Sequence, residues 1–238
     1  MNICYSQNAV IKAVECDNTY TGDSLVLKEM FDSAYKESTT STLIMDKCKG
    51  GFAVRDDKYI IPDEIKEAVL CALAYYPELS EYRLVFKYRN IIGTVNARPD
   101  VMNLFRKRTN RKFILLINNN KGEERGLSML QIPFNAKVGW FGHEFAHVYT
   151  YHLMNNLQSL IFSIRYISSG KYAKKVERYT DLIAIQRGFL FQLYEGDNYL
   201  RNNTEITKKY KKRTLYNALT LKEYMCLWYH YRFDNPIQ

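Results

Sequence analysis

The sequence predicts an α+β domain in which a small three-stranded sheet packs on helices. Two observations lead to this fold class. Periodic patterns follow one another along the chain in the order helix, three strands and then further helices, which is typical of α+β domains. The chain also has 238 residues, of which 47% are hydrophobic and 14% aromatic. This length and composition are sufficient for a buried core and argue against disorder.

The first part of the chain is the least patterned. Residues 1–61 are expected to be an N-terminal extension, with one helix over Ser24–Lys36, and residues 62–238 to be the main domain. A helix starts at Pro62, because proline suits the first turn and the acidic residues after it suit the positive end of the helix dipole. Apolar residues then recur at helical spacing until this helix ends near Pro77.

Three strands are expected next. Tyr82–Tyr88 alternates apolar and polar residues, and Lys112–Asn118 is a nearly continuous apolar run. Leu127–Ile132 is expected to be the third strand, because it is rich in apolar residues and ends at Pro133, which cannot continue a strand ladder.

Three helices are expected after the strands. The first is capped by Asn135 and runs to about Met154, the second covers about Ala173–Tyr194, and the last covers about Leu221–Tyr231.

The first of these helices carries the pattern His-Glu-x-x-His, at His143, Glu144 and His147. Residues four apart lie on one face of a helix, so both imidazoles can bind one metal ion, and Glu144 projects beside them where it can activate a water. The chain has only four histidines, so chance would produce this pattern in well below ~1% of such sequences. We therefore predict a zinc site with Glu144 as general base.

The apolar face of the same helix supports this prediction. Its stripe, at about 100° per residue, consists of Val138, Phe141, Phe145, Val148 and His152. His143 and His147 fall on nearly the opposite side, where packing does not explain them. His152 lies on the stripe itself, so we expect a hydrogen-bonded core histidine rather than a metal ligand.

A zinc site needs a third protein ligand, and the downstream pattern Glu-x-x-x-Asp offers one. With this pattern the chain resembles the gluzincin metallopeptidases. The resemblance implies that Glu177 is the third ligand and that Asp181 orients a ligand histidine. Over about Pro62–Tyr194 the layout resembles the compact peptidase core of the CAAX-protease and HtpX group, which implies a zincin-like fold. The chain departs from that group in lacking transmembrane helices.

The resemblance also implies a function, that of a zinc-dependent endopeptidase acting on a peptide or protein substrate. The strand before the metal helix, here Leu127–Ile132, would be a sheet edge that binds an extended peptide. Gluzincins usually add a His or Tyr that stabilises the oxyanion. His230 is the remaining histidine and the candidate for this role, although one of the 20 tyrosines is an alternative.

Other functions fit the same residues. A zinc-dependent hydrolase of non-peptide amides or esters would use the same metal and base, and a non-catalytic zinc-stabilised binding module would use the same ligands. The net charge of +9 raises nucleic-acid binding as a third alternative. Its basic clusters, however, are separated in sequence and carry no nucleic-acid-binding motif, so we expect a solvated surface and no nucleic-acid partner.

The remaining signals concern the compartment. No segment approaches the roughly 20 apolar residues of a membrane span, and the first residues are too polar for a signal peptide. The five cysteines are scattered without a Cys-x-x-Cys pair, which favours mostly free thiols and a cytoplasmic location. One disulfide among Cys4, Cys16 and Cys48 is an alternative. The sequence carries no signal for an oligomeric state or a cleavage preference.

Overall fold

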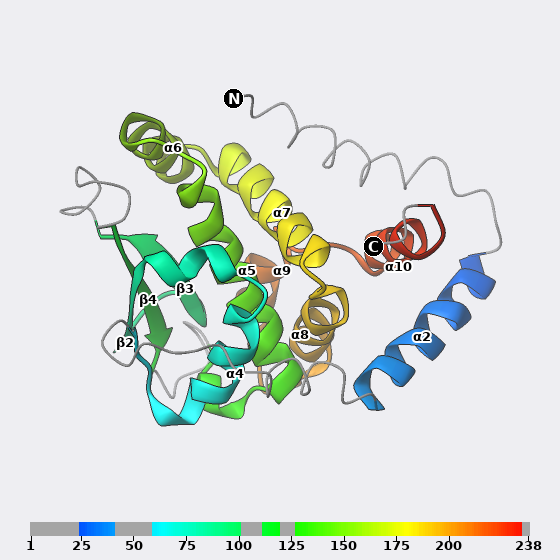
Figure 1. Ribbon diagram of the computed structural model, residues 1–238. Helices are drawn as coiled ribbons and strands as arrows, with labels where there is room; N and C mark the ends of the chain where they lie inside the picture. The colour runs from blue at the N-terminus through cyan, green and yellow to red at the C-terminus, as the bar shows by residue number, and fades with distance from the viewer. Residues whose placement is uncertain (1–23, 41–58, 101–110, 120–126, 235–238) are drawn as a thin grey trace.

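The structure is a computed structural model that describes residues 24–40, 59–100, 111–119 and 127–234 (Figure 1). It confirms a mixed α+β fold. The sheet has four strands in the order β1 (Tyr59–Ile60), β2 (Arg83–Arg89), β4 (Lys112–Asn118) and β3 (Val95–Pro99). Strands β1, β2 and β4 are parallel, and β3 runs antiparallel to β4. In the described residues, β3 and β1 are therefore the two edges.

Helices make up most of the described chain. They are α2 (Ser24–Thr40), α4 (Asp63–Leu73), α5 (Phe134–His152), α6 (Asn156–Ser168), α7 (Gly170–Gln186), α8 (Leu190–Asn202), α9 (Lys208–Leu215) and α10 (Leu221–Tyr229). None of the described helices is long and apolar enough to cross a membrane. Figure 1 shows α5 at the centre, with the sheet and α4 on one side and α7 and α8 on the other.

The prediction of a strand at Leu127–Ile132 was wrong. This segment contains a 3₁₀ turn, Met129–Gln131, whose first residue follows the cap Ser128. Leu127, Met129 and Ile132 are buried in the core, whereas Leu130 is exposed. Burial alone produces an apolar pattern in a short segment of either kind. The third main strand is instead β3, which the sequence did not indicate because its buried positions are Ala97 and Pro99, two weak strand formers.

The helix boundaries also differ from the prediction in two places. Helix α5 begins directly after Pro133 without a side-chain cap, so the predicted cap at Asn135 lies inside its first turn. The single helix expected over Ala173–Tyr194 is two helices, α7 and α8, because Gly188 adopts a φ of 97° and ends the first of them. Helices α6 and α9 were not predicted.

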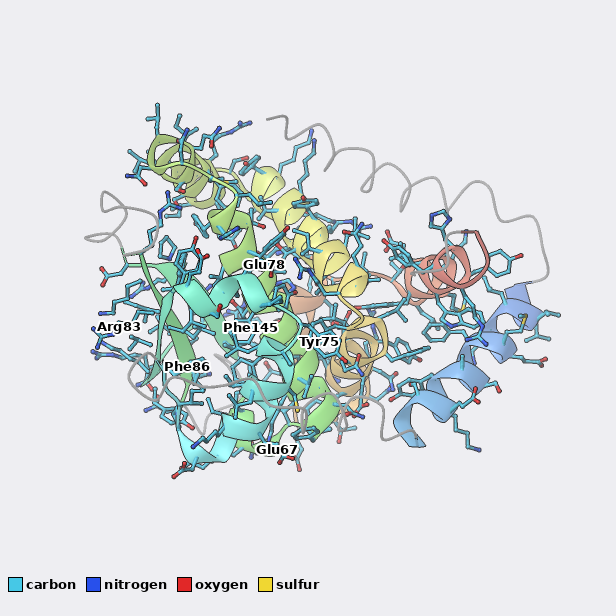
Figure 2. All side chains as sticks on the ribbon, viewed as in Figure 1. Glu67, Tyr75, Glu78, Arg83, Phe86 and Phe145 are labelled. Carbon is cyan, nitrogen blue, oxygen red and sulfur yellow. The ribbon has the colours of Figure 1, made fainter. Side chains whose placement is uncertain are left out.

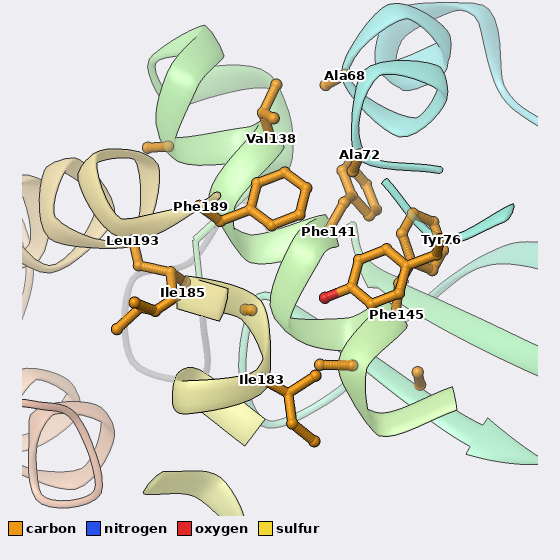
Figure 3. Packing of buried hydrophobic residues seen from close by; sticks show 14 of the residues in the cluster. Ala68, Ala72, Tyr76, Val138, Phe141, Phe145, Ile183, Ile185, Phe189 and Leu193 are labelled. Carbon is orange, nitrogen blue, oxygen red and sulfur yellow. The ribbon is translucent and has the colours of Figure 1, made fainter. Parts of the chain in front are cut away.

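The core forms around α5, and the apolar residues of the predicted stripe are buried. Val138, Phe141 and Phe145 are fully buried against α4 and the segment after α7, as Figure 3 shows. On the sheet side, Phe86 of β2 packs edge-on to Phe141, at 6.4 Å between ring centroids. Phe86 and Phe145 both point into the space between sheet and helices (Figure 2). The opposite face of α5 is thereby turned toward α7.

Helix α8 lies unusually close to α5 because of a glycine. A Cβ at Gly139 would come within 2.5 Å of the carbonyl carbon of Gln192, a separation that real Cβ atoms do not show. Only a residue without a side chain allows this approach. The consequence for the site is that α8 brings its inner face next to the metal-binding face of α5.

Part of the expected N-terminal extension packs on the same core. Leu27 and Phe31 of α2 are buried, and Phe31 makes edge-on contacts with Tyr194 of α8 and Trp228 of α10 at 5.0 and 6.0 Å. Helix α2 therefore contributes to the domain rather than standing apart from it.

The two described cysteines differ in state. Cys226 is buried and forms no disulfide, whereas Cys71 of α4 is disulfide-bonded. The expectation of mostly free thiols therefore holds for only one of them, and cysteine usage gives no support to a reducing compartment.

Candidate metal centre

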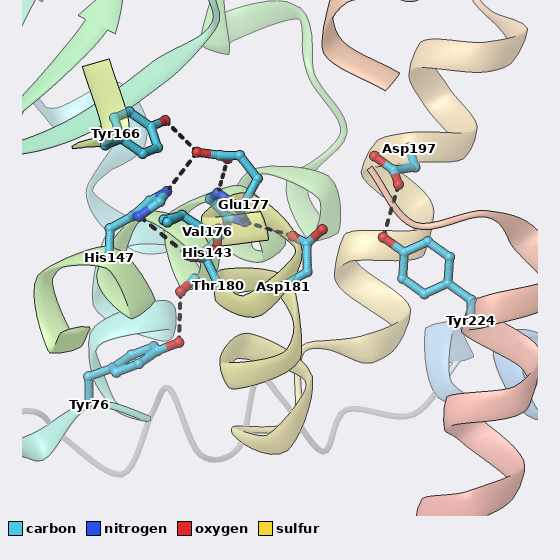
Figure 4. A network of polar contacts seen from close by, with 11 residues as sticks. Tyr76, His143, His147, Tyr166, Val176, Glu177, Thr180, Asp181, Asp197 and Tyr224 are labelled. Atoms are coloured by element: carbon cyan, nitrogen blue, oxygen red, sulfur yellow. Dashed lines mark hydrogen bonds and ion pairs between the residues drawn. The ribbon is translucent and has the colours of Figure 1, made fainter. Parts of the chain in front are cut away.

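Two helices that are not consecutive in the sequence bring three side chains together. Helix α5 supplies His143 and His147, and α7 supplies Glu177 (Figure 4). Their ligand atoms all lie within 4.8 Å of one another. The two carboxylate oxygens divide between the two rings: Oε2 lies 3.1 Å from Nε2 of His143, and Oε1 lies 3.5 Å from Nε2 of His147.

These separations fit a zinc ion. Zinc binds nitrogen and carboxylate oxygen at about 2.0–2.1 Å in tetrahedral geometry, so neighbouring ligand atoms should be about 3.3–3.4 Å apart. The separations of 3.1 and 3.5 Å between the ring nitrogens and the carboxylate oxygens bracket that value. Two imidazoles and one carboxylate are also a donor set typical of catalytic zinc, which leaves the fourth position open.

Both ring nitrogens that face away from this cluster have partners that orient the rings. Nδ1 of His143 lies 2.7 Å from Oδ1 of Asp181, and Nδ1 of His147 lies 3.3 Å from Oγ1 of Thr180. The Thr180 hydroxyl donates its proton to the carbonyl of Val176, so its oxygen accepts from the imidazole N–H. Both contacts place an N–H on Nδ1, so the neutral form of each ring has its Nε2 lone pair directed at the cluster, as metal binding requires.

The pKa values of the cluster residues also favour a bound cation. Burial alone would lower the pKa of His143, but its hydrogen bonds with Asp181 and Glu177 hold that pKa well above its ordinary value. Burial alone would raise the pKa of Glu177, but the imidazoles of His147 and His143 hold it well below. The carboxylates of Asp181 and Glu177 therefore favour a positive charge at the two imidazoles. A divalent cation supplies more positive charge there than a proton does.

Glu144 lies beside the cluster but is not one of its ligand atoms. Its side chain is buried, and Oε2 accepts a hydrogen bond from the backbone N–H of Ala97 in β3. Burial raises the pKa of Glu144, and the neighbouring His147 and His143 oppose this only in part. A carboxyl group with a raised pKa, held next to a metal position, is suited to proton transfer.

A tyrosine from α6 also reaches the cluster. The Tyr166 hydroxyl donates a hydrogen bond to Oε1 of Glu177, and its ring lies 6.3 Å from that of His147. Tyr166, Thr180 and the Ala97 N–H were not identified from the sequence. No local pattern distinguishes one tyrosine among 20, and α6 itself was not predicted.

The other two histidines lie elsewhere. His152 is half-buried on the core stripe, where Tyr82 OH lies 2.8 Å from its Nδ1, as expected for a structural histidine. His230 lies at the C-terminal end of α10, where a π-helical turn begins, and its ring packs against Tyr231 at 5.8 Å. The structure does not bring His230 into the cluster. Tyr166 lies at the cluster instead, where the oxyanion-stabilising His230 was expected.

A cavity of about 180 Å³ opens beside the cluster. His143, Glu144, Glu177 and Asp181 all contribute to its wall, so it gives access to the metal position and to the expected base.

No known protein family, no curated protein and no solved structure was found to match this chain. The interpretation of the site therefore depends on its own geometry.

Replacing Asp181 with Ala is expected to weaken zinc affinity by roughly 10–100-fold without unfolding the protein. The reason is its 2.7 Å contact with His143, which holds that ring in position. Competition with a zinc-binding dye measures the affinity, and circular dichroism checks the fold. An unchanged affinity would show that the contact with His143 has no part in metal binding.

Proposed function

We propose that this protein is a zinc-dependent endopeptidase with gluzincin-like ligands on a zincin-like fold. The single observation that carries the proposal is the convergence of Nε2 of His143, Nε2 of His147 and the Glu177 carboxylate, with Glu144 buried beside them. A purely structural zinc site would close its fourth position with another protein ligand. The described residues near this cluster offer instead an adjoining cavity and a carboxylate suited to act as a base.

Zinc held by these three residues would supply a Lewis acid that polarises the scissile carbonyl. Glu144 removes the proton from the attacking water and later passes it to the leaving amine. The hydrogen bond from Ala97 N–H holds Oε2 of this carboxylate, so Oε1 is left to carry the proton. Among the described residues, Tyr166, whose hydroxyl donates to Glu177 beside the metal position, is our candidate for the donor that stabilises the developing negative charge on the carbonyl oxygen.

The proposed peptide track differs from the one expected from the sequence. Leu127–Ile132 is not a strand, so it offers no edge. Strand β3 pairs with β4 on one side, and on its other side the N–H of Ala97 faces Glu144. An extended peptide bound along β3 would pass directly beside the base. Val95, the first residue of β3, and Thr94, which precedes it, also line the cavity, so the same track would direct a substrate side chain into it.

The test is a measurement of metal content and hydrolysis on the purified protein. We expect one zinc ion per chain, cleavage of a mixed peptide library, loss of cleavage with a chelator and its return when zinc is added. Small amides and esters assayed in parallel separate an endopeptidase from the alternative hydrolase. A zinc-loaded protein that cleaves only the small compounds would refute the peptidase assignment, and one that cleaves neither would favour the non-catalytic zinc module.

A further inference from the structure

The cavity beside the metal centre has two chemically different parts. One end carries the metal-binding residues, and the rest is enclosed by α8, α9, α10 and the start of β3. The residues that enclose this second part include Leu193, Asp197, Leu200, Tyr210, Ala218 and Tyr224. The whole cavity, metal end included, has a volume of about 180 Å³, which is enough to admit a single side chain, since a cavity of about 150 Å³ in another protein holds a benzene ring.

Asp197 is the charged residue in this second part. It is only 9% exposed, and its Oδ2 accepts a hydrogen bond of 2.9 Å from the hydroxyl of Tyr224, as Figure 4 shows. In the described chain no lysine or arginine forms an ion pair with it. The nearby Arg201, one turn further along α8, donates to the backbone carbonyl of Leu219 instead.

A buried carboxylate with only a hydroxyl partner is costly, because the hydroxyl replaces little of the water that a full charge loses. The pKa of Asp197 reflects this cost. Burial, and after it the negative charge of Asp181, raises that pKa to about 7. Asp197 thus faces the same cavity as Asp181 and the metal-centre carboxyl groups of Glu144 and Glu177. A cation beside Asp197 would relieve its repulsion with Asp181 and keep Asp197 ionised.

The apolar part of the wall restricts what kind of cation fits. Leu193 and Leu200 of α8 and Ala218 line the space beside Asp197. A small hydrated ion would gain nothing from these side chains. An alkyl stem that ends in a positive charge would pack its methylene groups against them and place its charge at the carboxylate.

We propose that this cavity is the specificity pocket of the peptidase and that Asp197 binds the ammonium or guanidinium group of a substrate Lys or Arg side chain next to the scissile bond. This inference rests on the proposed function and adds the substrate class to it. The track along β3 supports it, because Thr94 and Val95 connect that strand to the cavity.

The first test compares charged side chains with uncharged ones of the same shape. Peptides that differ only in Lys against norleucine, or Arg against citrulline, are assayed with the zinc-loaded protein. We expect kcat/KM to be about 10–1000-fold higher for the charged member, since removing one partner of a buried charge pair has effects of this size. The two pairs show which of the two cations is preferred.

The variant Asp197→Asn is expected to remove this preference while zinc content and cleavage of the norleucine peptide persist. Asparagine keeps the shape and an oxygen that accepts the Tyr224 hydroxyl, so the fold should be retained. The matched control is Glu195→Gln, which removes a carboxylate of the same helix that contacts Tyr35 and does not line the cavity. It should leave the preference unchanged.

A binding measurement makes the inference independent of hydrolysis. Butylguanidine should raise the melting temperature of the wild type and not that of Asp197→Asn, whereas uncharged butylurea should affect neither. Peptide cleavage without a preference for the charged residue would overturn the inference and leave the proposed function standing. Absence of cleavage together with an Asp197-dependent shift would overturn the proposed function and retain the cation site. Equal shifts with wild type and variant would exclude Asp197 as the binding group.

Discussion

Glu144→Gln is expected to abolish peptide hydrolysis while zinc stays bound and the fold is retained. General acid–base catalysis contributes typically ~10²–10⁴-fold, and Glu144 would serve two proton transfers, so the loss of kcat should reach or exceed that range. Glutamine has no proton-accepting carboxylate. It does keep a carbonyl oxygen that can accept the hydrogen bond from Ala97 N–H, so the contact between α5 and β3 should survive.

The measurements are zinc content, thermal stability and kcat on the wild type and the variant side by side. Retained zinc is the internal control, because it shows that His143, His147 and Glu177 are undisturbed. In a structural site the same substitution would change none of the three quantities. Hydrolysis that persists undiminished in a variant with full zinc content would show that another group is the base.

Glu177→Gln should have the second largest effect, a decrease in zinc affinity of more than about 100-fold, and with it the loss of zinc-dependent activity at low metal concentration. The two carboxylate oxygens of Glu177 each face a histidine Nε2, at 3.1 and 3.5 Å. Among the described residues, Glu177 is the carboxylate that joins both histidines in one cluster. The amide is a weaker, uncharged oxygen donor. The effect should exceed that of Asp181→Ala, which disturbs only the orientation of one ring.

Competition with a chelating dye gives the affinity of both variants. The exposed Glu205 provides the control, because Glu205→Gln removes the same charge far from any contact with the histidines. A Glu177 variant that binds zinc as tightly as the control would exclude Glu177 as a ligand, and the site would then need a different third donor.

The spacing of residues along helices was enough to predict which residues of the candidate site share a helix face, whereas the roles of Glu177 and Asp181 were implied by the resemblance to the gluzincin metallopeptidases. His143 and His147 share a face of α5 because residues four apart always do, and the same rule relates Glu177 to Asp181 on α7. The apolar stripe of α5 was predicted by the same periodicity and is buried. These predictions depend only on backbone geometry within one helix, which the order of residues determines directly.

Contacts between elements could not be predicted in that way. The strand that meets Glu144 is β3, whose alanine and proline give little strand signal, and not the apolar Leu127–Ile132. Tyr166 reaches Glu177 from a helix that was not predicted.

The sequence by itself thus determined which residues share a face of one helix and which kinds of ligand lie on that face. Only the tertiary structure decided which faces meet. Asp197 enters the metal-centre cavity because α8 packs closely on α5 at Gly139, a contact between segments about 50 residues apart. The physical reason is that hydrophobic periodicity specifies that a face is buried, whereas the partner it is buried against depends on steric fit between distant segments.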